Sequence, residues 1–221
     1  MKAMILAAGR GERMRPLTDR VPKPLLEIDG KPLIVYHIET LAAAGFGEIV
    51  VNIAYLGEQI VDALGDGKEW GIPIRYSDER ETGALESAGG IVEALPLLGD
   101  APFLVVNGDV RTDYPFDARF TMPDTQAHLV LVPNPVHNTA GDFGLRDGLA
   151  LDVAAERYTF SGIGWYRPEF FEGVPRGRSA LGPLLRRRMG EKKVSAELYG
   201  GFWRDIGTPQ RLAEMNGGNR G

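Results

Sequence analysis

The sequence predicts an α/β protein with a mixed, mainly parallel sheet flanked by helices, in a single domain covering residues 1–221. Short apolar runs alternate with helical patterns up to residue 107, an order that is typical of parallel sheets. The chain has 221 residues, of which 43% are hydrophobic, and this is enough to bury one full core. No linker-like segment divides the chain.

The first half of the chain consists of alternating strands and helices. A helix is predicted over 32–44, because Pro32 suits a first helical turn and Gly45 suits a helix end. Pro96 should end a later helix at residue 95, since proline disfavours the helical conformation of the residue before it. The other predicted elements are strands at 2–6, 48–53, 74–77 and 103–107 and helices at 57–64 and 87–95. This order places helices on both faces of the sheet.

After Asp109 the loops become longer, and we divide the domain into a first half of about 1–110 and a second half of about 111–215. The second half contains strand-like segments at 128–133, 158–167 and 194–199 and an amphipathic helical pattern at 179–189. The glycine-rich end, 216–221, is expected to be frayed.

Composition excludes several classes of function. A net charge of −5 argues against a nucleic-acid surface, which is normally basic. No apolar run approaches the roughly 20 residues needed to span a membrane, and the N-terminus lacks the apolar length of a signal peptide. Without cysteine, disulfides, thiolate metal sites and cysteine nucleophiles are impossible. A cytoplasmic protein without nucleic-acid or membrane partners is therefore expected, and its oligomeric state stays open.

The loop after the first strand, LAAGRGERMRPLTDRVPKP at 6–24, has the chemistry of a polyphosphate site. Gly9 and Gly11 allow backbone N–H groups to approach an anion closely. Arg13 and Lys23 add two positive charges. A dinucleotide fingerprint is excluded because Met14 stands at its third glycine position. The Gly-Lys pairs at 30–31 and 67–68 lack the Ser or Thr of a P-loop, and the alternative is a turn with solvated basic residues.

Two aspartates are candidates for a metal site. Asp109 follows a buried strand and should lie at the carboxyl end of the sheet, where ligands bind in open α/β folds. Asp205 stands much later, in the segment W-R-D-I-G-T-P. Mg²⁺ is usually held by one or two carboxylates together with substrate phosphates, which fits this pair. The alternatives are a turn residue at Asp109 and a helix-capping residue at Asp205.

The segment G-x-G-x-R-M-x-P-L-T followed by P-K-P-L resembles the signature of the sugar-1-phosphate nucleotidyltransferases. The resemblance continues at V-N-G-D (106–109), F-S-G-I-G (160–164) and W-R-D-I-G-T-P (203–209), so it covers nearly the whole chain. It implies a Rossmann-like nucleotidyltransferase fold, with a nucleotide half and an acceptor-sugar half. It also implies an enzyme that joins a nucleoside triphosphate to a sugar 1-phosphate and releases pyrophosphate, with Mg²⁺ as cofactor.

The resemblance assigns roles to individual residues. Arg13 would bind the β- and γ-phosphates and Lys23 the α-phosphate, while Asp109 and Asp205 would hold Mg²⁺. The stretch L-E-S-A-G-G at 85–90 aligns with the family's L-G-T-A-G, although a helix capped by Ser87 would also explain it. His137 is a further candidate for the acceptor site. The nucleotide-binding candidates are Ala8, Gly9, Gly11, Asn52, Glu86 and Gly89, and the acceptor-binding candidates are Asn107, Gly144 and Ser161.

The segment V-P-N-P-V-H-N-x-x-G-D-F-G at 132–144 resembles members that use UTP and N-acetylmuramic acid 1-phosphate in peptidoglycan recycling, whereas the common E-K-P motif is absent. This acceptor carries a lactyl carboxylate, for which the second half offers Arg146, Arg157, Arg178, Arg187 and Arg204. Alternatives are GTP with mannose 1-phosphate, UTP or dTTP with glucose 1-phosphate, or a non-catalytic nucleotide-sugar binding subunit. No general base is required, since a sugar phosphate with a second pKa of about 6 is mostly dianionic at neutral pH.

Overall fold

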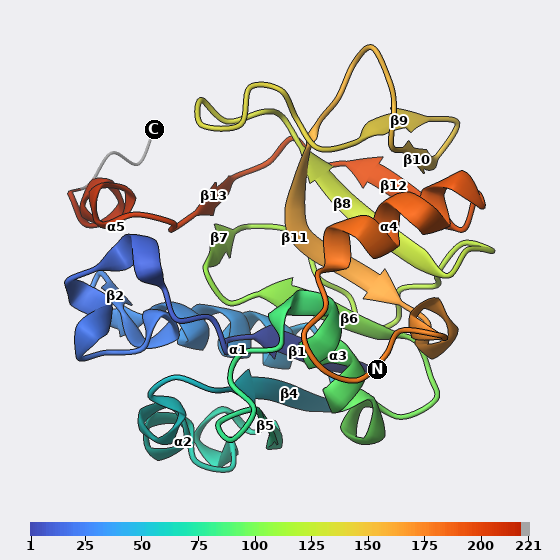
Figure 1. The fold of residues 1–221 in the computed structure, drawn as a ribbon. Helices are drawn as coiled ribbons and strands as arrows, with labels where there is room; N and C mark the ends of the chain where they lie inside the picture. Colours follow the sequence, from blue (N-terminus) through green and yellow to red (C-terminus); the bar gives the residue numbers. More distant parts are fainter. Residues whose placement is uncertain (218–221) are drawn as a thin grey trace.

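A nine-stranded mixed sheet runs through both halves of the chain in the computed structural model, which describes residues 1–217 (Figure 1). The strand order is β5-β4-β1-β6-β11-β8-β12-β10-β9. The strands are β1 (Lys2–Leu6), β4 (Glu48–Ile53), β5 (Ile74–Asp78), β6 (Phe103–Asn107), β8 (Ala127–Val132), β9 (Gly144–Arg146), β10 (Leu149–Leu151), β11 (Thr159–Tyr166) and β12 (Val194–Leu198).

The strands β5, β4, β1 and β6 are parallel, and β1 lies between β4 and β6. The strand β11 is antiparallel to β6 and to β8, whereas β12 is parallel to β8. The predicted mixed, mainly parallel α/β fold is therefore confirmed. Two small sheets lie beside the large one: β7 (Val110–Thr112) pairs with β13 (Trp203–Asp205), and β2 (Glu27–Ile28) pairs with β3 (Lys31–Pro32).

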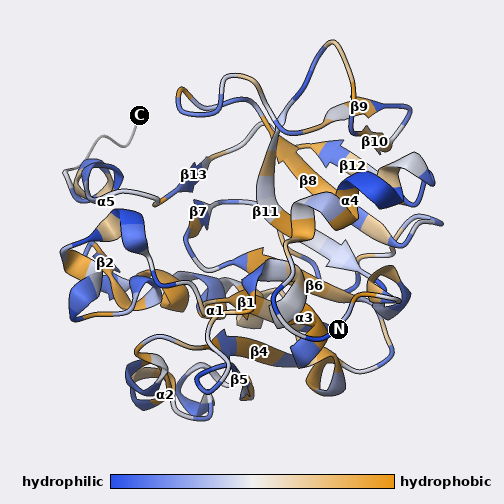
Figure 2. Ribbon diagram, in the orientation of Figure 1, coloured by the Kyte–Doolittle hydropathy of each residue, from blue (hydrophilic) through white to orange (hydrophobic). Residues whose placement is uncertain are grey.

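Helices cover both faces of the sheet, as predicted. Side chains of β1 alternate between two buried cores, with Ile5 in the core that includes residues of α1 and α2, and Met4 in the core that includes residues of α3 and α4. Figure 2 shows the corresponding hydrophobic colour along the central strands β1 and β8. The helices are α1 (Leu33–Ala43), α2 (Gly57–Leu64), α3 (Glu86–Leu98), α4 (Leu181–Gly190) and α5 (Pro209–Asn216). No helix within residues 1–217 has the length and apolar character of a membrane span.

Two predictions about helix ends are wrong. The helix α3 does not stop before Pro96 but continues to Leu98, which is buried in the core beneath it. Burial of that last turn outweighs the hydrogen bond that proline cannot donate. Asn216 is not frayed: it ends α5, donates to the carbonyl of Glu27 and accepts from the N–H of Asp29. The N–H of Gly217 donates to the carbonyl of Ala213 at 2.8 Å, and the other residues of the predicted frayed end, 218–221, lie outside the described residues.

The helix α5 was not predicted from the sequence. Thr208 caps it, because its side-chain oxygen accepts a hydrogen bond from the N–H of Arg211. Leu212 of α5 packs with Ile206, Met14 and Ile28 in a third, smaller core. This core attaches the C-terminal segment to the loop after β1, and it therefore brings Asp205 near the predicted phosphate site.

Candidate active site

A cavity of about 340 Å³ opens at the carboxyl ends of β1 and β6. It is bordered by the loop after β1, by the start of α3 and by the segment that follows β6. Nine residues predicted for the site line this cavity: Ala8, Gly9, Gly11, Arg13, Lys23, Asn52, Glu86, Asn107 and Asp109. The fold thus assembles most of the residues predicted to bind nucleotide and metal, although ligand contact itself stays a prediction.

The predicted phosphate loop, residues 6–24, is tightly folded around Gly11. Gly11 adopts a φ of 67°, and a Cβ there would lie 2.9 Å from the Thr18 methyl group, so only glycine fits without strain. The Thr18 hydroxyl donates to the Gly11 carbonyl at 2.8 Å, and the Met14 side chain is fully buried beneath the loop. Nothing lies within 4 Å of a Cβ built at Gly9. Thr18 and Met14 therefore fix the loop on its buried side. The backbone at Gly9 stays accessible, so a phosphate can approach it.

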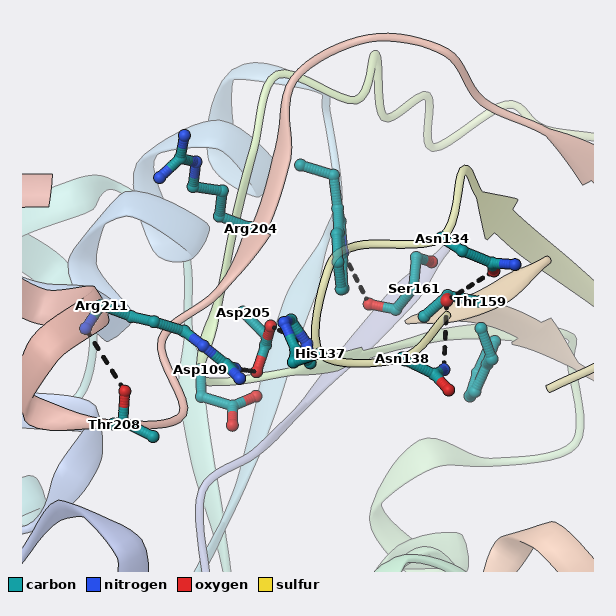
Figure 3. Close-up of polar contacts among 12 residues, drawn as sticks. Asp109, Asn134, His137, Asn138, Thr159, Ser161, Arg204, Asp205, Thr208 and Arg211 are labelled. Atoms are coloured by element: carbon teal, nitrogen blue, oxygen red, sulfur yellow. Dashed lines mark hydrogen bonds and ion pairs between the residues drawn. The ribbon is translucent and has the colours of Figure 1, made fainter. Parts of the chain in front are cut away.

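Asp109 and Asp205 meet at the edge of this cavity, as their predicted metal role requires (Figure 3). The strand β7 begins one residue after Asp109 and pairs with β13, so that Asp205 lies opposite Val110. The N–H of Ile206 donates to the carbonyl of Asp109 at 2.7 Å. Sheet pairing, and not sequence proximity, places the two carboxylates side by side.

Cationic and imidazole side chains surround both carboxylates. Lys23, whose side chain is 13% exposed, forms a salt bridge with Asp109. Asp205 contacts Arg211, and its Oδ1 lies 3.0 Å from Nε2 of His137. A Cβ at Gly207 would lie 2.8 Å from Asp205 Oδ2, 2.9 Å from Arg211 Nη1 and 3.6 Å from Arg13 Nη2. The absence of a side chain at Gly207 therefore leaves room for the ion pair between Asp205 and Arg211, and Arg13 lies nearby.

His137 reaches Asp205 from a loop that is braced by its own hydrogen bonds (Figure 3). Thr159 of β11 donates to Asn134 Oδ1 at 2.9 Å, and Asn138 donates to the Thr159 hydroxyl at 3.1 Å. These bonds fix the backbone on both sides of His137. The sequence suggested His137 for the acceptor site, but the structure places it against a predicted metal ligand.

The residues present fit a divalent cation. Asp205 Oδ1 is buried and has no hydrogen-bond partner of good geometry, despite the nearby imidazole. Within residues 1–217 no group of three or more metal-binding side chains is formed. Two carboxylates suffice for Mg²⁺ when substrate phosphates and water complete its coordination.

Both polar atoms of the Asn52 side chain form hydrogen bonds within the protein. Its Oδ1 accepts from the N–H of Ala7 at 2.7 Å, and its Nδ2 donates to Oε1 of Glu79 at 2.7 Å. The other oxygen of Glu79 accepts from the N–H of Leu85 at 2.8 Å. Burial raises the pKa of the Glu79 carboxyl above its ordinary range. This buried pair, of which the sequence reasoning missed Glu79, links the phosphate loop to the start of α3.

Gly89 does not line the cavity. Its N–H donates to the Ser179 carbonyl at 3.0 Å, and a Cβ at this position would lie only 2.2 Å from the Gly177 carbonyl oxygen. Gly89 therefore allows the segment before α4 to pack directly on α3. Ser87 does not cap α3, whose N-cap residue is Leu85 without a side-chain hydrogen bond, and it lines the cavity instead.

A second cavity of about 480 Å³ adjoins the first, and both are lined by Glu86, Ser87 and Asn107. Its other lining residues come from the 142–143 segment, β11, α4 and the N-cap residue of α4: Asp142, Phe143, Phe160, Ala180, Leu181, Gly182, Leu185 and Arg186. Asn107, one of the predicted acceptor-binding residues, therefore borders both cavities. The sequence reasoning did not identify the contribution of α4.

The other two acceptor candidates line neither cavity. Gly144 follows Phe143 and is buried. A Cβ built at Gly144 would lie only 2.2 Å from the Cβ of Ala154, so a larger residue would clash there. The Ser161 hydroxyl donates to the Val130 carbonyl at 2.7 Å, and its own carbonyl accepts from Trp203 at 2.9 Å. Each of these residues follows a lining residue of the second cavity, Phe143 or Phe160.

None of the five arginines suggested for the lactyl carboxylate lines the second cavity. Arg178 pairs with Glu86 at 2.6 Å, Arg157 donates to the Asp142 carbonyl, and Arg204 lies 3.8 Å from Glu214. Arg146 and Arg187 are exposed. Among the described residues, the one cationic side chain that lines this cavity is Arg186.

The fold and the two adjoining cavities at one edge of the sheet are those expected of a protein that transfers nucleotidyl groups. Residues 2–146 match the family model described as nucleotidyl transferase, and the chain belongs to that family. It is 55% identical to N-acetylmuramate alpha-1-phosphate uridylyltransferase of Neisseria meningitidis serogroup B, over 97% of this chain and 96% of that protein.

Two further similarities are more distant. Mannose-1-phosphate guanyltransferase of Aspergillus oryzae is 44% identical over 52% of this chain, a match that spans 32% of that longer protein. The fold is similar to that of a Bacillus anthracis protein proposed to be a glucose-1-phosphate thymidylyltransferase, with a TM-score of 0.81 and 23% identity, covering 98% of this chain and 94% of that one.

Proposed function

We propose that this protein transfers the uridylyl group of UTP to N-acetylmuramic acid 1-phosphate, giving UDP-N-acetylmuramic acid and pyrophosphate. The observation that carries the proposal is the pair of adjoining cavities, which share Glu86, Ser87 and Asn107. One has the polyphosphate chemistry of a nucleotide site, and the other is large enough for a sugar. The relative that is 55% identical over nearly its whole length supports the choice of nucleotide and acceptor.

Within this proposal, nucleotide occupies the half of the domain before about residue 110 and the sugar phosphate occupies the half after it. Asn107, the last residue of β6, and Asp109, two residues later, stand at the junction. An acceptor phosphate beside Asn107 would face the α-phosphate of a nucleotide that lies along the loop of Gly9 and Gly11. This arrangement favours in-line transfer, in which positioning supplies much of the rate enhancement.

In the proposed reaction an acceptor phosphate oxygen forms a bond to the α-phosphorus, while the bond from the α-phosphorus to the bridging oxygen of pyrophosphate breaks. Lys23 would neutralise the α-phosphate, and Arg13 the charge that develops on pyrophosphate. Asp109 and Asp205 would hold Mg²⁺, which supplies further positive charge to the phosphates when bound. No residue has to remove a proton, because the acceptor phosphate is already ionised.

Two alternatives account for fewer of these observations. A different substrate pair, such as GTP with mannose 1-phosphate, is supported by a relative that matches only about half of this chain. A non-catalytic sugar-nucleotide binding subunit would not need the cavity-lining Arg13, Lys23 and Asp109 together with the adjacent Asp205. The catalytic proposal uses all four.

The test is pyrophosphate release from the purified protein with Mg²⁺ across a grid of UTP, GTP, dTTP and CTP against four acceptors. These acceptors are the 1-phosphates of N-acetylmuramic acid, N-acetylglucosamine, glucose and mannose. We expect the highest kcat/KM for UTP with N-acetylmuramic acid 1-phosphate. A higher value for another pair would replace the proposed substrates, and no release with any pair would refute catalysis.

A further inference from the structure

The second cavity has a distinctive charge pattern. Much of its lining is apolar, with Phe143, Phe160, Leu181 and Leu185 among its residues, and both of its carboxylates already have partners. Glu86 pairs with Arg178 at 2.6 Å. Asp142 Oδ2 accepts from the N–H of Phe160 at 2.9 Å and from Asn138 at 3.1 Å. Among the residues that the structure describes, Arg186 is thus the single cationic residue in the lining of this largely apolar cavity.

Two neighbours hold the Arg186 guanidinium in place. Its central carbon lies 5.2 Å from the centroid of the Phe143 ring, a favourable cation–π distance. Its Nη1 contacts Asp152, which does not line the cavity. Contacts of this kind orient a long side chain before a ligand arrives and so reduce the entropy that is lost on binding.

The pair between Arg186 and Asp152 leaves capacity for a ligand. Their side chains are 43% and 39% exposed, and ion pairs at such exposure contribute only about 0–1 kcal/mol. Arginine has five N–H donors in a planar fork, and one hydrogen bond from Arg186 is formed within residues 1–217. The remaining donors are suited to bidentate binding of a carboxylate.

The acceptor in the proposed function carries two anionic groups, a phosphate and a lactyl carboxylate. Because Asn107 lines both cavities, the phosphate would lie beside it, and a cation within the second cavity would then suit the carboxylate. We infer that Arg186 binds this carboxylate and thereby selects N-acetylmuramic acid 1-phosphate over N-acetylglucosamine 1-phosphate. This inference rests on the proposed function and extends it to one specificity-determining residue.

The test compares kcat/KM for the two acceptors at saturating UTP in the wild type, Arg186→Gln and Arg186→Lys. The matched control is Arg187→Gln, which changes the adjacent exposed arginine outside both cavities. We expect the preference for the lactyl substrate to fall at least about tenfold in Arg186→Gln, because a polar contact that selects a substrate is lost. The loss should appear in the acceptor KM and not in the KM for UTP, and Arg187→Gln should retain the preference.

Arg186→Lys should give an intermediate preference, since lysine keeps the charge and loses the planar fork. Thermal unfolding of each variant checks that the fold is intact. A wild-type enzyme that prefers N-acetylmuramic acid 1-phosphate and an Arg186→Gln variant with the same preference would overturn the role of Arg186 while the proposed function stands. A wild type without that preference would overturn the acceptor assignment, and the role of Arg186 with it.

Discussion

The N–H of Ile206 donates to the carbonyl of Asp109 at 2.7 Å, and this bond joins two segments that are far apart in the sequence. It continues the pairing of β7 with β13 beyond its last residue pair. Asp109 and Asp205 consequently lie next to each other, although one follows a strand of the large sheet and the other precedes the C-terminal helix. The proposed metal site is therefore sensitive to any change that separates these two segments.

Replacing either aspartate should abolish turnover. We expect Asp109→Asn and Asp205→Asn each to lower kcat by at least about 100-fold, because the variants lose a charged oxygen ligand for Mg²⁺. The measurement is pyrophosphate release at saturating substrates, with Asp124→Asn, an exposed aspartate, as control. EDTA should stop the wild-type reaction and added Mg²⁺ should restore it. Near-normal kcat in either variant would remove that residue from the metal site.

Arg13→Lys should lower kcat more than it raises the KM for UTP. The planar guanidinium can contact two oxygens of the departing pyrophosphate, whereas an ammonium group is a point charge. An interaction that matters chiefly in the transition state appears in kcat. Steady-state kinetics with varied UTP measures both constants, and Arg20→Lys changes another exposed arginine of the same loop as a control. If only KM changed, Arg13 would bind the ground state alone.

Gly89→Ala should destabilise the protein. The added Cβ would lie 2.2 Å from the Gly177 carbonyl and 3.1 Å from the Ser179 nitrogen, and overpacking of this kind costs typically about 1–3 kcal/mol. Urea unfolding measures the change. Gly190→Ala is the matched control, because nothing lies within 4 Å of its Cβ and alanine is favoured over glycine in a helix. Equal stability of the two variants would show that the contact between α3 and the 177–179 segment is easily displaced.

Stability should fall as the pH drops below about 6.5, because of His37. Burial lowers the pKa of His37 to about 4 from its ordinary value of 6.5. Between these two values the unfolded chain binds a proton at this residue and the folded chain does not, so acidification favours unfolding. The loss should reach on the order of 3 kcal/mol near pH 4.

The free energy of unfolding, measured in urea at several pH values from 4.5 to 7.5, tests this contribution. The variant His37→Leu places an apolar side chain in the same buried position and has no imidazole to protonate. Its stability should depend less on pH than that of the wild type over this range. Parallel curves for the two proteins would mean that other groups cause the pH dependence.

The sequence by itself determined most of the secondary structure, and it predicts a phosphate site in the loop at 6–24. The predicted strands 2–6, 48–53 and 103–107 match β1, β4 and β6 residue for residue. The sequence indicates Gly11, Arg13 and Lys23 as candidates for this site, because backbone freedom and charge can be read from a short segment alone. Asp109 was placed at the carboxyl end of the sheet because the strand before it is unambiguous.

Only the tertiary structure decided how distant segments meet. Burial of Leu98 carries α3 past Pro96, although the local preference is to stop there. The side-chain amide of Asn52, a predicted nucleotide-binding residue, donates its hydrogen bond to Glu79. Among the many arginines, Arg186 alone lines the second cavity in the described part of the chain. These outcomes depend on packing between elements, which the local pattern of residues does not contain, because a side chain's partners are set by the arrangement of the whole sheet and its helices.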